Sequence, residues 1–128
     1  MRALLIVSHG SRRQQSNEEV NELAQNLNDL LNGSFEVIHS AFLEIAEPSI
    51  PEGIDKCAAL GADSIMVLPY FLAAGRHVAE DIPSIVNEAR KKYPKISIEI
   101  SRHIGAFEQM PWLISRELIK PILKEYLT

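Results

Sequence analysis

Two histidines stand where apolar segments of the chain end. His9 follows the run at residues 3–8, and His77 comes shortly after the run at residues 65–69. A neutral imidazole binds borderline divalent metals and, with a pKa near physiological pH, also accepts protons. Each histidine alone is more readily explained as a hydrogen-bonded structural residue. If the two runs are neighbouring parallel strands, however, both histidines lie at one edge of a sheet and can hold one metal ion together.

A carboxylate is expected near the same edge. Glu44 follows the apolar run that ends near residue 42, so it can serve as a proton acceptor there or be an exposed loop acid. Glu80 and Asp81 lie next to His77, but acids at this position also suit the first turn of a helix, which is the interpretation we favour for them.

Several cations and two apolar side chains lie in the loops that follow predicted strands one, three and four. Arginine suits carboxylates and phosphates because it donates paired hydrogen bonds. The apolar loop at residues 70–76 can pack on a flat hydrophobic ligand, on a second subunit or on its own domain. His103 is a weaker candidate for this rim. The residues concerned are Arg12, Arg13, Arg76 and Arg102, together with Phe71 and Leu72.

Hydrophobic periodicity predicts the elements that position these residues. Four short apolar runs alternate with stretches of helical spacing, which indicates a βα unit repeated four times. The pattern predicts one α/β domain over residues 1–128. This domain is flavodoxin-like, with a four-stranded parallel sheet of order 2-1-3-4 and helices on both faces. Strands one and three are apolar throughout and are therefore expected to be covered on both faces. The predicted strands are 2–8, 35–42, 63–70 and 95–101.

The helices are predicted from apolar stripes and from proline and glycine. The first helix is expected to end before Gly33, the second to begin at Pro48, and the third to carry Pro83 in its first turn. A last helix is expected at about 109–127, with a kink or a break at Pro121. The buried stripe of the first helix is Val20, Leu23, Ala24, Leu27, Leu30 and Leu31.

Composition narrows the class of partner. The chain has 128 residues, 46% of them hydrophobic, and a net charge of -4, which argues against a nucleic-acid binder. No apolar run approaches the length of a membrane span, and no signal of the secretory kind is present, so we expect a cytoplasmic protein without a membrane partner. The single cysteine, Cys57, falls on a helical stripe and is interpreted as a core thiol.

Three motifs together resemble the small CbiX-type chelatases, which are class II chelatases. They are Ser-His-Gly-Ser-Arg at residues 8–12, Phe-Leu-Glu at 42–44 followed by Pro48, and the stretch from Leu68 to Pro83. The most specific part is the pattern Pro-x-Phe-Leu-x-x-Gly-x-His-x-x-x-Asp-Ile-Pro. The resemblance covers most of the chain.

This resemblance implies a function and a set of site residues. It implies insertion of a divalent metal, usually Co2+, into sirohydrochlorin without nucleotide hydrolysis or an organic cofactor, in cobalamin or related tetrapyrrole biosynthesis. On the matching positions it implies that His9 and His77 are metal ligands and proton acceptors and that Glu44 assists them. It also implies a homodimer whose two domains face each other across a cleft. Substrate contacts are inferred without a matching motif, and the residues concerned are Arg12, Arg76, Phe71, Leu72 and Trp112.

Two other functions are compatible with part of the pattern. A histidine phosphatase also places a histidine after its first strand, but it needs an arginine where this chain has Ser8. A metal or tetrapyrrole carrier can use the same histidines without turnover. The metal itself stays open between Co2+, Ni2+, Fe2+ and Zn2+, because imidazole and carboxylate ligands suit all four.

Overall fold

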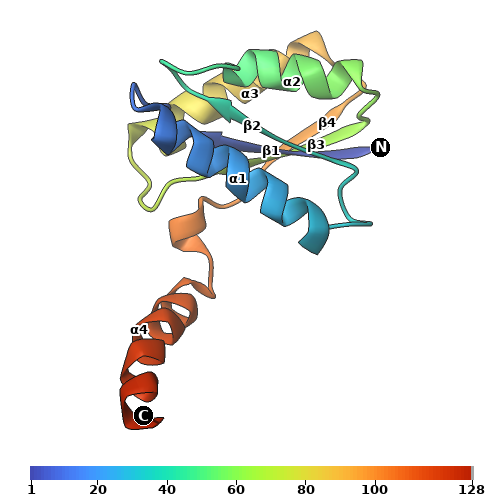
Figure 1. Ribbon diagram of the computed structural model, residues 1–128. Coiled ribbons are helices and arrows are strands. Elements are labelled where there is room, and N and C mark those ends of the chain that lie inside the picture. Colours follow the sequence, from blue (N-terminus) through green and yellow to red (C-terminus); the bar gives the residue numbers. More distant parts are fainter. Residues whose placement is uncertain (128) are drawn as a thin grey trace.

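The centre of the molecule is a parallel sheet of four strands, shown in the computed structural model in Figure 1. The structure describes residues 1–127, with side chains as far as residue 124. The strand order β2-β1-β3-β4 confirms the predicted order. Strands β1 and β3 are neighbours, so their carboxyl ends lie side by side. The strands are β1 (Arg2–Ser8), β2 (Val37–Phe42), β3 (Ser64–Pro69) and β4 (Ser97–Ile100).

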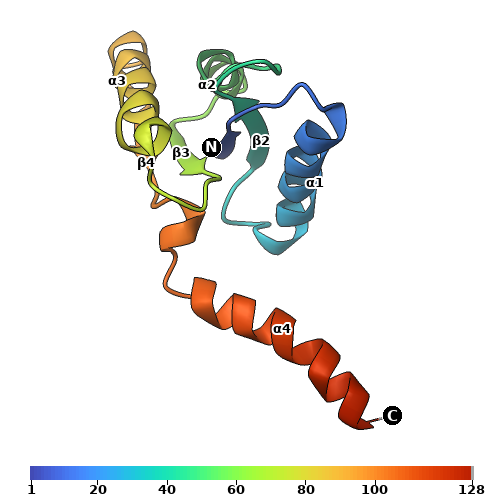
Figure 2. The ribbon, with the colours of Figure 1, turned by 90° about the vertical axis from the view of Figure 1, so that its left-hand side faces the viewer.

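Helices cover both faces of the sheet, as predicted (Figures 1 and 2). Helix α1 lies on one face, where Val20 and Ala24 share an apolar core with Leu4 and Ile6 of β1. Helices α2 and α3 lie on the other face and form a second core, which includes the buried Cys57. Burial raises the pKa of the Cys57 thiol. The bounds are α1 (Gln14–Leu30), α2 (Ile50–Ala59) and α3 (Ile82–Lys92).

The last helix, α4 (Met110–Leu127), extends away from the sheet (Figures 1 and 2). It continues through Pro121 as one helix, so of the predicted kink or break the break does not occur. Among the described residues, α1 is then the one helix on its face of the sheet, and it lies over β1 and β2. The prediction that β3 is covered on both faces is therefore wrong. Its Ile65 and Val67 are buried on the α2 and α3 side, whereas Met66 and Leu68 are only half-buried.

Two helix predictions need correction. Helix α2 begins at Ile50, not at Pro48, because Ser49 makes the better cap: its hydroxyl accepts from the backbone N–H of Glu52, whose carboxylate accepts from the N–H of Ser49. Leu30, predicted to be buried, is 79% exposed. At about 100° per residue, Leu30 lies about 80° around the helix axis from Val20 and about 100° from Leu31.

Polar contacts join α2 to the end of α3. Asp55 on α2 accepts hydrogen bonds from the Tyr93 hydroxyl and from the Lys92 ammonium, which lies 3.0 Å away. The Tyr93 hydrogen bond first, and the Lys92 hydrogen bond second, lower the pKa of the Asp55 carboxyl below its ordinary value. This contact therefore links the two helices on the face opposite α1.

Candidate functional site

His9 is the first residue after β1, and the loop that carries it is held in place by a buried side chain of α1. The Oδ1 atom of Asn17 accepts from the backbone N–H of Ser11 at 2.9 Å, and its Nδ2 donates to the Ser11 carbonyl at 2.8 Å. Asn17 is one of the few buried polar residues, with 7% of its surface exposed. Because both backbone groups of Ser11 are bonded to one rigid helix, the loop that carries His9 has a fixed path.

Glu44 is brought to His9 by direct pairing of their backbones. The sheet register continues past β1 and β2, and the N–H of Glu44 donates to the His9 carbonyl at 3.1 Å. Gly10 makes this approach possible, since it has φ +95° and a side chain there would place Cβ 1.9 Å from the Glu44 carbonyl oxygen. The Glu44 carboxylate then lies 2.7 Å from Nε2 of His9.

His77 comes from the loop after β3, at the start of a single π-helical turn, His77–Asp81, that continues into α3. Its Nδ1 lies 2.7 Å from Oδ2 of Asp81. Its ring is tilted against that of Phe71, with the ring centroids 6.5 Å apart. The turn places residues 77 and 81 on the same side, which is why these two side chains meet.

The two imidazole rings of the candidate site lie edge to face. The ring centroids of His9 and His77 are 4.8 Å apart and the ring planes make an angle of 76°. Both side chains are partly open to solvent, with 45% and 42% of their surfaces exposed. Their strands, β1 and β3, feed helices on opposite faces of the sheet, so the site lies at the topological switch point where α/β proteins bind ligands.

The carboxylates determine which ring nitrogens carry a lone pair. An ionised carboxylate only accepts hydrogen bonds, so Nε2 of His9 donates to Glu44 and Nδ1 of His77 donates to Asp81. In the neutral rings the lone pairs then lie on Nδ1 of His9 and on Nε2 of His77. A carboxylate behind an imidazole fixes the tautomer and the orientation of the ring, as it does for histidines that bind metals.

No preformed cluster of three or more His, Cys, Asp or Glu side chains with metal-site geometry occurs among residues 1–124, whose side chains the structure describes. The candidate site instead consists of the two imidazoles, each backed by one carboxylate. A groove of about 300 Å³ opens beside them, and its lining includes Leu43, Glu44, His77 and Asp81. Such a site can hold an ion between two ligands and leave other coordination positions to a substrate.

The residues predicted to bind substrate around this site differ in what they contact and in how exposed they are. Arg12 lines a polar cavity of about 480 Å³ together with Asn17 and Glu47. Arg76 is 81% exposed and lies 3.6 Å from Glu80. Leu72 is 75% exposed.

Two further rim residues, Arg102 and His103, lie in the fourth loop, which is anchored next to the apolar loop. The N–H of Gly105 donates to the Phe71 carbonyl at 3.1 Å, and a Cβ at Gly105 would lie 1.7 Å from the Leu72 carbonyl oxygen. Trp112, by contrast, is on α4 and packs against the Arg116 guanidinium, 5.3 Å from its ring centroid.

Asp81 is the residue of this site that sequence reasoning missed. The sequence predicts Asp81 in the first turn of a helix, and it does stand just before α3, but its carboxylate contacts His77. The signal was present in the sequence as a histidine and an aspartate four residues apart, a spacing that brings side chains together on a helix.

Comparison with known proteins connects this geometry to a family. The CbiX family model matches residues 3–120. The chain belongs to the CbiX family. Its sequence is 32% identical to the sirohydrochlorin cobaltochelatase of Priestia megaterium over 98% of this chain and 38% of that protein. It is 36% identical to the chloroplastic sirohydrochlorin ferrochelatase of Arabidopsis thaliana over 80% of this chain and 44% of that protein.

The fold of this CbiX-family chain agrees with that of a solved member. The CbiX protein of Marinobacter aquaeolei VT8 superposes with a TM-score of 0.79 at 26% identity, covering 98% of this chain and 99% of that one. The chain thus spans less than half the length of the two chelatases named above and nearly the whole length of this structure. No helix within the described part of the chain is long and apolar enough to cross a membrane.

Proposed function

We propose that this CbiX-family chain inserts a divalent metal ion into sirohydrochlorin without hydrolysing a nucleotide and without an organic cofactor. The observation that carries the proposal is the pair of imidazole rings, with centroids 4.8 Å apart, each ring bonded to a carboxylate. Relatives named as sirohydrochlorin chelatases support the choice of substrate. The metal ion is a substrate in this reaction, so it enters and leaves with each turnover.

The chemistry needs a metal donor and proton acceptors on the same side of the ring. Insertion of M2+ displaces two pyrrole N–H protons, which must pass to bases within hydrogen-bond reach. We assign His9 and His77 as ligands that present the metal and as proton acceptors. Glu44 accepts a proton directly, or it accepts the Nε2 proton of His9 when that ring takes a pyrrole proton at Nδ1. Asp81 holds the His77 ring with Nε2 toward the metal.

We assign the surrounding rim to substrate binding. Sirohydrochlorin carries many carboxylates at its periphery, and the exposed guanidinium groups of Arg12 and Arg76 suit them. Phe71 and Leu72 offer apolar surface to the flat ring. The contact of the Phe71 ring with His77 supports this arrangement, because it places an apolar surface beside the proposed metal ligand.

We propose Co2+ as the preferred metal, for cobalamin or a related tetrapyrrole pathway. Imidazole and carboxylate ligands also suit Fe2+ and Ni2+, and the relatives are named for cobalt in one case and iron in another. The chain is proposed to act in the cytoplasm as one domain. Two such domains, facing each other as a homodimer, would enclose a ring that one open rim cannot surround.

The test is anaerobic absorbance of the protein with sirohydrochlorin in excess and Co2+, repeated with Fe2+ and Ni2+. Wild-type protein should show many turnovers per site above the spontaneous rate. His9→Ala and His77→Ala should each lower the insertion rate about 100-fold or more, since each removes a ligand and a base. Circular dichroism should show both variants folded, because both residues lie at the rim.

His39→Ala is the matched control, because His39 lies within β2 and away from the rim. It should leave the insertion rate within about twofold of wild type. Binding of metal and tetrapyrrole without insertion would instead identify a carrier that uses the same histidines. Normal turnover by both rim variants would refute the assignment of the site.

A further inference from the structure

The loop between β2 and α2 contains a residue in an unusual backbone conformation. Ile45 has φ +71°, and the backbone N–H of Ala46 donates to the Glu44 carbonyl at 2.7 Å. This combination is a classic γ-turn, which is rare and strained. A positive φ is a clear outlier for a β-branched residue, whereas glycine and asparagine adopt it at little cost. Ile45 therefore holds a conformation that another residue would adopt more easily.

The path of the loop requires the turn, but the fold does not require an isoleucine there. The backbone N–H of Phe42 donates to the Pro48 carbonyl at 2.9 Å, so the chain leaves the sheet and returns to it within residues 43–47. The Ile45 side chain is 58% exposed and belongs to neither apolar core. Backbone strain of this kind clusters at sites where ligands bind. The side chain of Ile45 is therefore expected to contact something outside the fold.

Ile45 is part of the wall of the polar cavity of about 480 Å³ described above. This cavity lies between the loop after β1, helix α1 and the loop after β2, and we call it the rim cavity. Its lining combines an apolar part with a polar part, so it suits a group that has an apolar stem and a polar end. The residues that matter here are Phe42, Ile45 and Ala46 in the apolar part and Arg12, Asn21 and Glu47 in the polar part.

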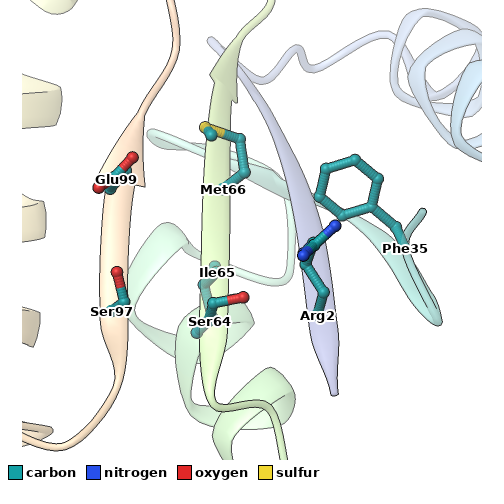
Figure 3. Close-up of a pocket in the computed structure, with 7 residues that line it drawn as sticks. All are labelled: Arg2, Phe35, Ser64, Ile65, Met66, Ser97 and Glu99. Carbon is teal, nitrogen blue, oxygen red and sulfur yellow. The ribbon is translucent and has the colours of Figure 1, made fainter.

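The rim cavity is adjacent to the pair of histidines. Glu44 lines the groove beside the histidines, and the next residue, Ile45, lines the rim cavity. The hollow shown in Figure 3 lies elsewhere, because its lining includes Arg2, Ser64 and Ser97, the first residues of β1, β3 and β4. It is at the amino ends of the strands, opposite the histidines. Of these two hollows, the rim cavity is the one that can receive part of a ligand bound at the histidines.

The polar lining of the rim cavity offers hydrogen-bond donors. Within the part of the chain that the structure describes, the Arg12 guanidinium has no hydrogen-bond or ion-pair partner. The Oδ1 atom of Asn21 accepts from the Ser40 hydroxyl, which leaves its Nδ2 as a donor. Donors select an acceptor, and a guanidinium group bonds most strongly to a carboxylate. Glu47, on the same lining, opposes an anion, so replacing it tests the charge of the occupant.

We propose that the rim cavity receives one carboxylate-bearing side chain of the tetrapyrrole, with its methylene stem against Ile45 and its carboxylate on Arg12. The identity of the ligand rests on the proposed function. The ring of the bound tetrapyrrole lies over the two histidines, one residue away along the chain from this cavity. The strain is then explained, because the γ-turn directs an apolar side chain toward the substrate at the expense of the stability of the free protein.

The experiment measures the Kd of metal-free sirohydrochlorin by anaerobic equilibrium dialysis, and the Tm of the same samples by circular dichroism. Ile45→Gly and Ile45→Asn should each raise the Kd about tenfold, because the contact of one apolar side chain is lost. Both residues accept a positive φ, so the Tm should stay within about 2 °C of wild type or rise. A side chain needed by the fold alone would instead lower the Tm and leave the Kd unchanged.

Two control variants separate this contact from general effects of exposed side chains. Leu60 is 53% exposed at the end of α2, on the opposite edge of the sheet, so Leu60→Ala should bind sirohydrochlorin with the wild-type Kd. Glu47→Gln removes a negative charge from the rim cavity and should bind as tightly as wild type or more tightly. A cationic occupant would make Glu47→Gln bind more weakly.

A double variant tests whether one group of the ligand makes both contacts. Arg12→Gln alone should raise the Kd about tenfold, as Ile45→Gly does. Two independent contacts would multiply to about 100-fold in the double variant. If one side chain of the ligand makes both contacts, it leaves the cavity when either is lost, and the double variant should lose no more than about 30-fold.

Four results would overturn the proposal for the rim cavity: an unchanged Kd in both Ile45 variants, a Tm more than about 2 °C lower in both, full multiplication in the double variant, or weaker binding by Glu47→Gln. Metal insertion is measured separately by absorbance. A protein that binds sirohydrochlorin in the expected way but inserts no metal refutes the proposed function and leaves the cavity assigned. Insertion with normal binding by the Ile45 variants does the reverse, and a wild-type protein that does not bind sirohydrochlorin refutes both.

Discussion

Gly10 allows a sharp test of how the site is built, through the substitution Gly10→Ala. An alanine there must adopt φ +95°, which costs about 1–2 kcal/mol in a left-handed conformation. Its Cβ would also lie 1.9 Å from the Glu44 carbonyl oxygen, and crowding of this kind typically adds about 1–3 kcal/mol. The free energy of unfolding should therefore fall by about 2–5 kcal/mol.

The matched control is Gly33→Ala. Gly33 has φ +91°, but no heavy atom lies within 4 Å of the position its Cβ would take. This variant should lose only the conformational part, about 1–2 kcal/mol. For a chain of 128 residues, 1 kcal/mol corresponds to about 4 °C in Tm. Thermal unfolding followed by circular dichroism should thus give a Tm about 4–8 °C lower for Gly33→Ala and about 8–20 °C lower for Gly10→Ala.

The same substitution should also lower the proposed activity. To restore an ordinary contact, the segment at Glu44 must move by about 1 Å, and a misplacement of this size can cost about 100-fold in rate. Metal insertion by Gly10→Ala, measured well below its Tm, should fall by about that factor, and Gly33→Ala should insert at the wild-type rate. Equal losses of stability in the two variants would refute the claim that the close approach to Glu44 constrains this loop.

Three other changes test separate contacts. Asp81→Asn should lower the insertion rate about 10–100-fold with little change in Tm, because it weakens the bond that orients His77; an unchanged rate would remove Asp81 from the site. Asn17→Ala should lower the free energy of unfolding in urea by about 1–3 kcal/mol, because the backbone groups of Ser11 lose their partners. A loss below about 0.5 kcal/mol, which is what a neutral surface substitution gives, would contradict this. Asp55 has a lowered pKa in the folded state, so its contribution to stability is present above pH ~4 and is lost as the pH falls through the folded value. Unfolding measured between about pH 6 and pH 2 should show a smaller acid loss for Asp55→Asn, and an identical pH dependence would argue against the contact.

The fold could be predicted from the sequence because its signals are local. Apolar runs at residues 2–8 and 63–70 predict buried parallel strands, and the helical spacing between runs predicts the crossovers. Together they determine the 2-1-3-4 order, since right-handed crossovers leave few alternatives. The predicted start of α2 is wrong because prolines stand on both sides of Ser49, at positions 48 and 51. The capping hydrogen bonds of Ser49 leave the first proline outside the helix and the second inside it.

Only part of the candidate site could be predicted from the sequence. His9, His77 and Glu44 follow predicted strands, so their meeting at one edge was predictable from topology. The contact of Asp81 with the His77 ring depends on the π-helical turn. The spacing of four residues is compatible with this contact, but it is equally compatible with Asp81 as an acid in the first turn of a helix. The role of Gly10 depends on how closely two loops approach, and that distance is set by the register between β1 and β2.

The sequence by itself determined the family, the strand order and the two histidines at the switch point, because periodicity and motif spacing are properties of the chain alone. Only the tertiary structure decided which carboxylate holds which imidazole and where α4 points. Both depend on contacts between segments far apart in the chain, such as Gly105 against the loop at Leu72. An apolar stripe shows that a helix must pack, but the surface it packs against is set by how the rest of the chain is arranged in space.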